Sequence, residues 1–205
     1  MSNPASEQTK STADGYVVAV VGATGLVGRT MISVLEERNF PVRRLVPLAA
    51  SAAGRSVTFR GEQVAVAEAA PDAFRGVDIA LFSAGADVSL LLAPEAAARG
   101  CAVVDNSSAW RMDPTVPLVV SQVNPEALKE HRGIIANPNC STMQLAPLLQ
   151  ALHVEAGLRR VVVATYQAVS GAGAESVNDL IQQRAAVVAG EKPVSTIYPH
   201  PVILS

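Results

Sequence analysis

The sequence has no marked excess of charge of either sign. Its 16 lysine and arginine residues nearly balance 18 aspartate and glutamate residues, and the formal net charge is -2. This balance provides no broad attraction to nucleic acid phosphates or to anionic membranes. There is no apolar run close to the roughly 20 residues that span a bilayer, and the N-terminus lacks the basic-then-apolar pattern of a secretory signal. We therefore expect a cytoplasmic protein with neither nucleic acid nor membrane partners.

Cysteine is also scarce. Cys101 and Cys140 have neither the spacing of metal ligands nor the density of a disulfide framework, so we expect no metal site. Cys101 precedes an apolar run and is expected to be inert in the core. Cys140 follows an apolar strand and a polar turn, and it opens a helical pattern. The amides and dipole at a helix N-terminus favour the reactive thiolate, which makes Cys140 the candidate nucleophile.

The chain has 205 residues, of which 49% are apolar, enough for a substantial core. Apolar runs with strand character alternate with stretches that have helical spacing. The expected strands include Val17–Val21, Val77–Phe82 and Ala102–Asp105, and the expected helices are Leu26–Arg38, Val88–Arg99 and Thr142–His153. This alternation indicates an α/β fold, a doubly wound Rossmann-type parallel sheet.

The pattern divides the chain into three parts. Residues 1–15 are small and polar, which indicates a disordered leader, and residues 16–157 form the expected Rossmann-type domain with the cysteine. Residues 158–205 are expected to begin a second domain. This part contains the valine-rich run Leu158–Val169, a helix at Ala174–Val188, and the tail Ile197–Ser205, which we expect to be a strand whose partners follow later.

A glycine turn links the first expected strand to the first expected helix. It reads Gly22-Ala23-Thr24-Gly25-Leu26-Val27-Gly28. Glycine permits a tight turn and lets backbone N–H groups approach a pyrophosphate, and the helix N-terminus adds partial positive charge. In this context the motif predicts a dinucleotide site.

The choice of dinucleotide depends on the second strand. NAD-binding domains usually carry an acidic residue about 20 positions after the glycine turn. The segment Arg43–Ala53 contains no aspartate or glutamate, and Ser51, Arg55 and Ser56 provide donors for a 2'-phosphate. The sequence therefore favours NADP.

Five segments together resemble the aspartate-semialdehyde dehydrogenases. They are the glycine turn and residues 82–85, 104–114, 137–142 and 165–173, which read FSAG, VDNSSAWRMDP, NPNCST and TYQAVSGAG. Each alone is weak, but five in the same order are specific, and the resemblance runs from about Val17 to Gln182. The N-acetyl-glutamyl-phosphate reductases share the plan but differ in the cysteine segment.

The resemblance implies a role for particular residues. Cys140 would be the catalytic nucleophile, and Gln167 would orient the thioacyl intermediate. Arg111 would bind the phosphate or acyl phosphate, and Asn139 would join Arg111 and Gln167 in binding substrate. The implied cofactor residues are Gly22, Thr24, Gly25, Leu26, Val27, Ser51, Ala52, Ser83, Ala84, Gly85, Asn106, Ser170 and Gly171.

The implied reaction is the NADP-dependent reduction of aspartyl phosphate to aspartate semialdehyde through a cysteine thioester, with release of phosphate. It belongs to lysine, methionine and threonine biosynthesis. The resemblance also implies that residues 16–157 are an NAD(P)-binding Rossmann domain with the catalytic cysteine. It implies that residues 158–205 begin a truncated α+β catalytic or dimerisation domain, and that the protein is a homo-oligomer, a dimer or a tetramer. Two alternatives stay open: a non-catalytic NADP-binding module or partner subunit, and a reductase of another acyl phosphate.

The chain departs from the family pattern in two ways. None of His131, His153 and His200 matches the acid/base histidine of the family, which lies further along the chain. We therefore expect an incomplete chain with very weak or no activity by itself. Ser51 also stands where the family commonly has an arginine that contacts the 2'-phosphate, so use of NAD is a second expectation.

Overall fold

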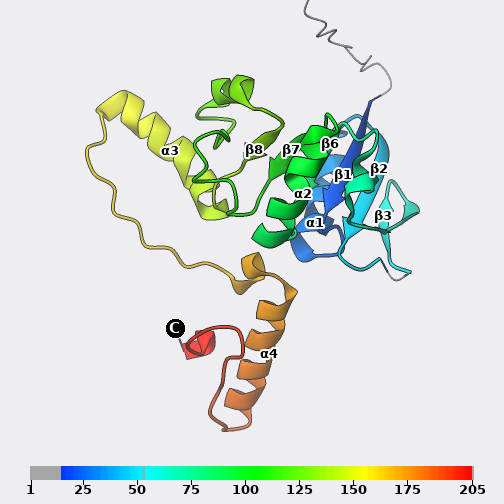
Figure 1. Ribbon diagram of the computed structural model, residues 1–205. Helices are drawn as coiled ribbons and strands as arrows, with labels where there is room; N and C mark the ends of the chain where they lie inside the picture. Colours follow the sequence, from blue (N-terminus) through cyan, green and yellow to red (C-terminus); the bar gives the residue numbers. More distant parts are fainter. Residues whose placement is uncertain (1–14, 53, 205) are drawn as a thin grey trace, which may run out of the picture.

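The computed structural model describes residues 15–52 and 54–204 and is built around a parallel sheet of six strands (Figure 1). The order across the sheet is β5-β2-β1-β6-β7-β8. The strands are β1 (Tyr16–Val21), β2 (Val42–Ala49), β5 (Ala67–Glu68), β6 (Ile79–Phe82), β7 (Ala102–Asp105) and β8 (Ile134–Ala136). Successive strands are added on one side of β1 and then on the other, which confirms the doubly wound fold. The leader predicted for residues 1–15 lies outside the described residues apart from Gly15.

Two further strands and four helices complete the main elements. The strands β3 (Ser56–Phe59) and β4 (Glu62–Ala65) form an antiparallel hairpin. The helices are α1 (Leu26–Glu37), α2 (Ala86–Ala98), α3 (Cys140–Ala156) and α4 (Ala174–Val188), and short 3-10 helices cover η2 (Pro71–Phe74), η3 (Pro125–Glu130), η4 (Val169–Ala172) and η5 (Val202–Leu204). All four long helices were predicted. α3 begins two residues earlier than its predicted start at Thr142 because Asn139 caps it.

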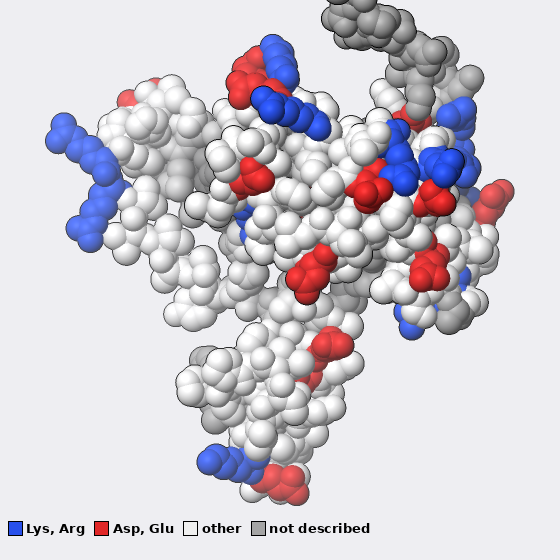
Figure 2. Space-filling model, viewed as in Figure 1, with Lys and Arg blue, Asp and Glu red and all other residues white. Residues whose placement is uncertain are grey.

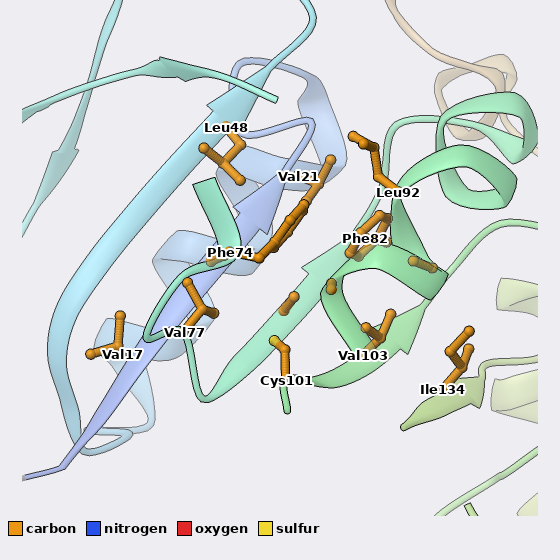
Figure 3. Close-up of a cluster of buried hydrophobic side chains, with 14 residues drawn as sticks. Val17, Val21, Leu48, Phe74, Val77, Phe82, Leu92, Cys101, Val103 and Ile134 are labelled. Carbon is orange, nitrogen blue, oxygen red and sulfur yellow. The ribbon is translucent and has the colours of Figure 1, made fainter. Parts of the chain in front are cut away.

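The core occupies both faces of the sheet because side chains alternate along a strand. On one face, Val17, Ala19 and Val21 belong to a cluster with Leu92 of α2 and the stacked rings of Phe74 and Phe82. Figure 3 shows this cluster. Val18 and Val20 face Ile32 of α1 on the other side. Cys101 is 1% exposed and belongs to the first cluster, as its apolar surroundings predicted.

The turn after β1 is held by close backbone contact. Gly22 has φ +88, and a Cβ on this residue would lie 2.4 Å from the carbonyl oxygen of Ser83. A Cβ on Gly28 would lie 2.1 Å from the carbonyl oxygen of Gly22. The two glycines therefore set how closely α1 approaches the turn and the loop after β6.

Replacing Gly28 by alanine is expected to destabilise the domain by about 1–3 kcal/mol, because the new methyl group meets backbone atoms that cannot rotate away. Urea unfolding of Gly28→Ala and the wild type measures this. Thr30→Ala, an exposed change on the same helix, is the matched control. Equal stability of Gly28→Ala and the control would contradict the packing argument.

The C-terminal region differs from the sequence prediction. Residues 158–168 contain neither helix nor strand, and Tyr166 in this run is fully exposed. The predicted strand in the tail Ile197–Ser205 is wrong: Val202–Leu204 is a 3-10 helix. A strand needs a neighbour with free ladder groups, and within residues 15–52 and 54–204 none lies beside this tail. The tail instead folds back along α4 (Figure 1).

Polar side chains of α4 bind the tail and the two residues before it. Asp179 is 3% exposed and accepts hydrogen bonds from the backbone N–H of Thr196 at 2.8 Å and from the hydroxyls of Ser195 and Thr196. Gln183 donates to the Asp179 carboxylate at 2.6 Å and accepts from the backbone N–H of Ile203. The buried carboxylate therefore has donors on every side, as a buried charge requires.

These donors make the C-terminal region sensitive to acid. The backbone hydrogen bond from Thr196, followed by the hydroxyl and amide donors, lowers the pKa of Asp179 from its usual 3.8 despite burial. The carboxylate therefore stabilises the fold above the unfolded pKa, and this contribution is lost as pH falls through the lower folded value. The Tm gap between wild type and Asp179→Asn should be largest above about pH 5 and should shrink below it. A gap independent of pH, measured by circular dichroism, would contradict this assignment.

Charges of both signs are scattered over the visible surface with wide uncharged areas between them (Figure 2). Figure 2 shows no continuous patch of one sign on this face. In the described part of the chain, no helix is both long and apolar enough to cross a membrane.

Candidate active site

Four loops surround a cleft of about 400 Å³ at the carboxyl edge of the sheet. Three follow β1, β6 and β7, and the fourth is the glycine-rich segment that enters α4. The cleft is lined by Gly25, Leu26, Val27, Ser83, Ala84, Gly85, Asn106, Ser107, Ser170, Gly171, Ala172, Gly173 and Ala174. It lies where β1 separates the two halves of the sheet, the usual ligand position in doubly wound folds.

Three helix N-termini face this cleft. α1, α2 and α4 have Gly25, Gly85 and Gly173 as N-caps, and none of the three makes a side-chain cap hydrogen bond. The first amides of each helix are thus available to a ligand, and each N-terminus carries about half a positive charge. The arrangement suits an extended anion such as a pyrophosphate.

The structure gathers most of the predicted cofactor residues in this cleft. Gly22 and Thr24 lie in the turn behind it: Gly22 N–H donates to Leu48, and the Thr24 carbonyl accepts from Arg29. Four residues that were not predicted from the sequence also line the cleft: Ser107, Ala172, Gly173 and Ala174. For Ala172, Gly173 and Ala174, the sequence offers one signal: the run of small residues continues after Gly171.

Ser51 and Ala52 lie outside the cleft, in the loop after β2. The Ala52 carbonyl accepts from the backbone N–H of Arg55, which brings the exposed Arg55 back to this loop. Sheet pairing also places the exposed Glu68 of β5 beside Ala49 at the end of β2. Glu68 is not among the residues of the second strand, because it belongs to the neighbouring strand β5.

Cys140 is the exposed first residue of α3. Asn139 caps the helix, since its Oδ1 accepts from the backbone N–H groups of Ser141 at 3.0 Å and Thr142 at 3.4 Å. Gln167, 27 residues further on, points its Nε2 at Cys140 Sγ at 3.5 Å. The Ser141 hydroxyl donates to Gln167 Oε1 at 3.4 Å, which fixes the direction of this amide. The thiol therefore has a helix N-terminus beneath it and an amide donor beside it.

Arg111 is half-buried and bridges two backbone carbonyls. Its Nε donates to Asn137 O and its Nη2 to Asn106 O, both at 2.9 Å. In the described part of the chain no carboxylate lies within ion-pair distance of this guanidinium. The remaining N–H groups and the uncompensated charge are suited to an anion. Asn139, predicted to bind substrate, uses its side-chain oxygen for the helix cap.

No histidine within residues 15–52 and 54–204 is hydrogen-bonded to Cys140 Sγ. His131 accepts from the backbone N–H of Gly133, and His153 stands 13 residues along α3, about 20 Å from Cys140 by helical rise. The same part of the chain holds no group of three His, Cys, Asp or Glu residues placed to bind a metal.

The N-terminal region matches the family model for the semialdehyde dehydrogenase NAD binding domain over residues 17–131. The chain belongs to the semialdehyde dehydrogenase family. A second model of this family, its dimerisation domain, matches residues 145–205. It begins within α3, ahead of the boundary at residue 158 that the sequence suggested.

Several relatives of this chain are described as aspartate-semialdehyde dehydrogenases. Aspartate-semialdehyde dehydrogenase of Aquifex aeolicus is 54% identical over 193 residues, which are 92% of this chain and 57% of the relative. The structure of aspartate semialdehyde dehydrogenase II of Vibrio cholerae complexed with ASA superposes with a TM-score of 0.87 at 42% identity, over 93% of this chain and 57% of the other. The structure of aspartate semialdehyde dehydrogenase with NADP from Candida albicans gives a TM-score of 0.57 at 27% identity. That match covers 70% of this chain and 48% of the other. The chain thus spans about half the length of the relatives it matches.

Proposed function

We propose that this chain carries the acyl-transfer and cofactor-binding part of an NADP-dependent aspartate-semialdehyde dehydrogenase. The observation that supports it most is the position of Cys140 at the exposed N-terminus of α3 with Gln167 Nε2 at 3.5 Å from its sulfur. An exposed thiol at a helix N-terminus, with an amide donor beside its sulfur, is placed for nucleophilic attack.

The proposed step is an acyl transfer to sulfur. The Cys140 thiolate attacks the carbonyl carbon of an acyl phosphate, a C–S bond forms, and the C–O bond to phosphate breaks as inorganic phosphate leaves. Arg111 binds the phosphate group, whose negative charge it compensates throughout. Gln167 donates to the thioacyl group and holds it against the cleft. A thiolate suits the step because it is a good nucleophile and later a good leaving group.

Two features of the cleft support a dinucleotide site. Three uncapped helix N-termini face it, and its glycine-rich walls let a pyrophosphate approach the backbone amides. Gly25, Leu26 and Val27 would hold the pyrophosphate, with Ser83, Ala84, Gly85, Asn106, Ser170 and Gly171 around the rest of the molecule. A bound nicotinamide would supply or accept hydride at the acyl carbon.

NADP is the cofactor we propose, because residues 43–53 contain no carboxylate that would repel a 2'-phosphate. Arg55 and Ser51 in the loop after β2 provide donors for that phosphate. The relative from Candida albicans is described with NADP. Glu68 beside Ala49 is the feature that would work against this choice.

Aspartyl phosphate is the substrate we propose, on the name shared by the relatives. The reaction would place the protein in lysine, methionine and threonine biosynthesis. The match to the dimerisation domain supports a homo-oligomer as the working form.

The acyl-transfer half-reaction tests this function directly. The chain is incubated with aspartyl phosphate, and tryptic peptides are analysed by mass spectrometry. We expect the aspartyl mass on the Cys140 peptide, release of one phosphate per acyl group, and neither in Cys140→Ala. Acylation of Cys101 alone, or none in the wild type, would refute the proposal.

A second candidate is a dinucleotide-binding module without turnover. It is favoured by the lack of a histidine bonded to Cys140 Sγ in residues 15–52 and 54–204. Phosphate-dependent oxidation of aspartate semialdehyde with NADP separates the two, since the module binds NADP without forming NADPH. Acetyl phosphate in the acylation assay tests the third candidate, a reductase of another acyl phosphate.

A further inference from the structure

Asn137 lies between Asn106, which lines the cofactor cleft, and the cysteine turn, residues 137–140. It follows β8, and its backbone N–H donates to the Asp105 carbonyl at 2.8 Å, which continues the β7–β8 ladder by one residue. Pro138 restricts Asn137 to an extended conformation. The side chain of Asn137 is thereby brought beside that of Asn106, which follows β7.

The two asparagines are joined through their side chains. Asn137 Nδ2 donates to Asn106 Oδ1 at 2.5 Å. An asparagine amide has one accepting and one donating end, so engaging Oδ1 leaves Nδ2 of Asn106 as the free end. No acceptor for this Nδ2 occurs among the described residues, and Asn106 lines the cleft.

Arg111 closes the arrangement. Its guanidinium donates to the backbone carbonyls of both asparagines at 2.9 Å. A planar guanidinium that bridges two carbonyls holds them at a fixed separation. Arg111 thus fixes the backbones of Asn106 and Asn137 relative to each other. With the backbones fixed, the two side-chain amides form their hydrogen bond in one orientation.

We propose that Asn137 is a positioning residue for cofactor binding: it orients the Asn106 amide so that its N–H donors face the dinucleotide. Asn137 itself is not among the residues that line the cleft and acts through Asn106. The inference rests on the proposed dinucleotide site. It assigns a role to a residue of the cysteine turn that is separate from acyl transfer.

Calorimetric titration of NADP into the 205-residue chain tests the proposal. Asn137→Ala leaves the Asn106 amide free to rotate, and we expect the Kd to rise about tenfold, the effect of losing one well-placed hydrogen bond to a charged ligand. Asn137→Asp keeps the side-chain volume but removes the donor, so Asn106 turns its N–H groups towards the new carboxylate and binding weakens at least as much. Asn124→Asp, half-buried with both amide ends bonded, is the matched control and should bind as the wild type does.

A double-mutant cycle separates positioning from general damage. In an Asn106→Ala background, Asn137→Ala should change the Kd by less than about twofold, because the residue it orients is gone. Additive losses would overturn the inference, as would an unchanged Kd in both Asn137 variants with normal wild-type binding. A wild-type chain that binds no NADP would instead overturn the proposed cofactor site and the inference with it.

Discussion

Removing the sulfur of Cys140 is expected to slow alkylation of the folded chain by at least about 100-fold near neutral pH. The remaining thiol, that of Cys101, is buried and can react only when the core opens locally. Cys140 is exposed at the N-terminus of α3, whereas Cys101 is 1% exposed within the packed sheet. The measurement is the rate of carbamidomethylation of each cysteine peptide by iodoacetamide in the wild type and in Cys140→Ala.

Cys101→Ala is the control and should leave the fast reaction intact. In urea both cysteines should react at similar rates, since neither the helix N-terminus nor burial then exists. Similar rates for Cys101 and Cys140 in the folded chain would contradict both the helix-terminus argument and the assignment of the nucleophile.

Loss of the Arg111 guanidinium is expected to slow acylation by an acyl phosphate about 100-fold at low substrate concentration, as expected for charge-assisted hydrogen bonds to an anion. Arg111→Met is the variant, and the rate of Cys140 acylation by aspartyl phosphate is the measurement. Alkylation by iodoacetamide should stay within about twofold, because that neutral reagent has no phosphate to bind. This contrast separates anion binding from damage to the thiol.

Two further variants sharpen the test. Arg111→Lys keeps the charge but cannot bridge the carbonyls of Asn106 and Asn137 in one plane, so it should recover only part of the rate. Arg132→Met removes an exposed arginine on the loop before β8 and should have no effect. Equal losses of acylation and alkylation in Arg111→Met would show that Arg111 only supports the turn.

Local patterns predicted much of the fold. The bounds of β7 and α4 match the sequence prediction, because a short apolar run between polar turns and a helical repeat after glycine are both local signals. The glycine turn after β1 was found for the same reason. The tail was different. Val202–Leu204 has strand propensity, but the Ile203 N–H is bonded to Gln183, and Asp179 anchors Thr196 just before the tail. Sequence spacing does not reveal these contacts.

Individual residues of the candidate site were predicted from the sequence, but the hydrogen bonds between them were not. Cys140 could be placed at a helix N-terminus from the turn that precedes it. The bridge from Arg111 to Asn106 and Asn137 could not be predicted, because it depends on β7 and β8 being neighbours in the sheet. The cap by Asn139 was not predicted, although asparagine is a favoured residue at a helix N-cap.

The two ends of α3, the helix that carries Cys140, are stabilised to different degrees. None of the residues of α3 is buried, Leu148 and Val154 are 65% and 68% exposed, and Pro147 removes one backbone hydrogen bond within the helix. Deuterium uptake in the distal half should therefore precede uptake in α2, which buries four residues. The first turn is tied separately by Asn139 and Gln167. Opening of the distal turns would then be a subglobal event that leaves the environment of the thiol intact.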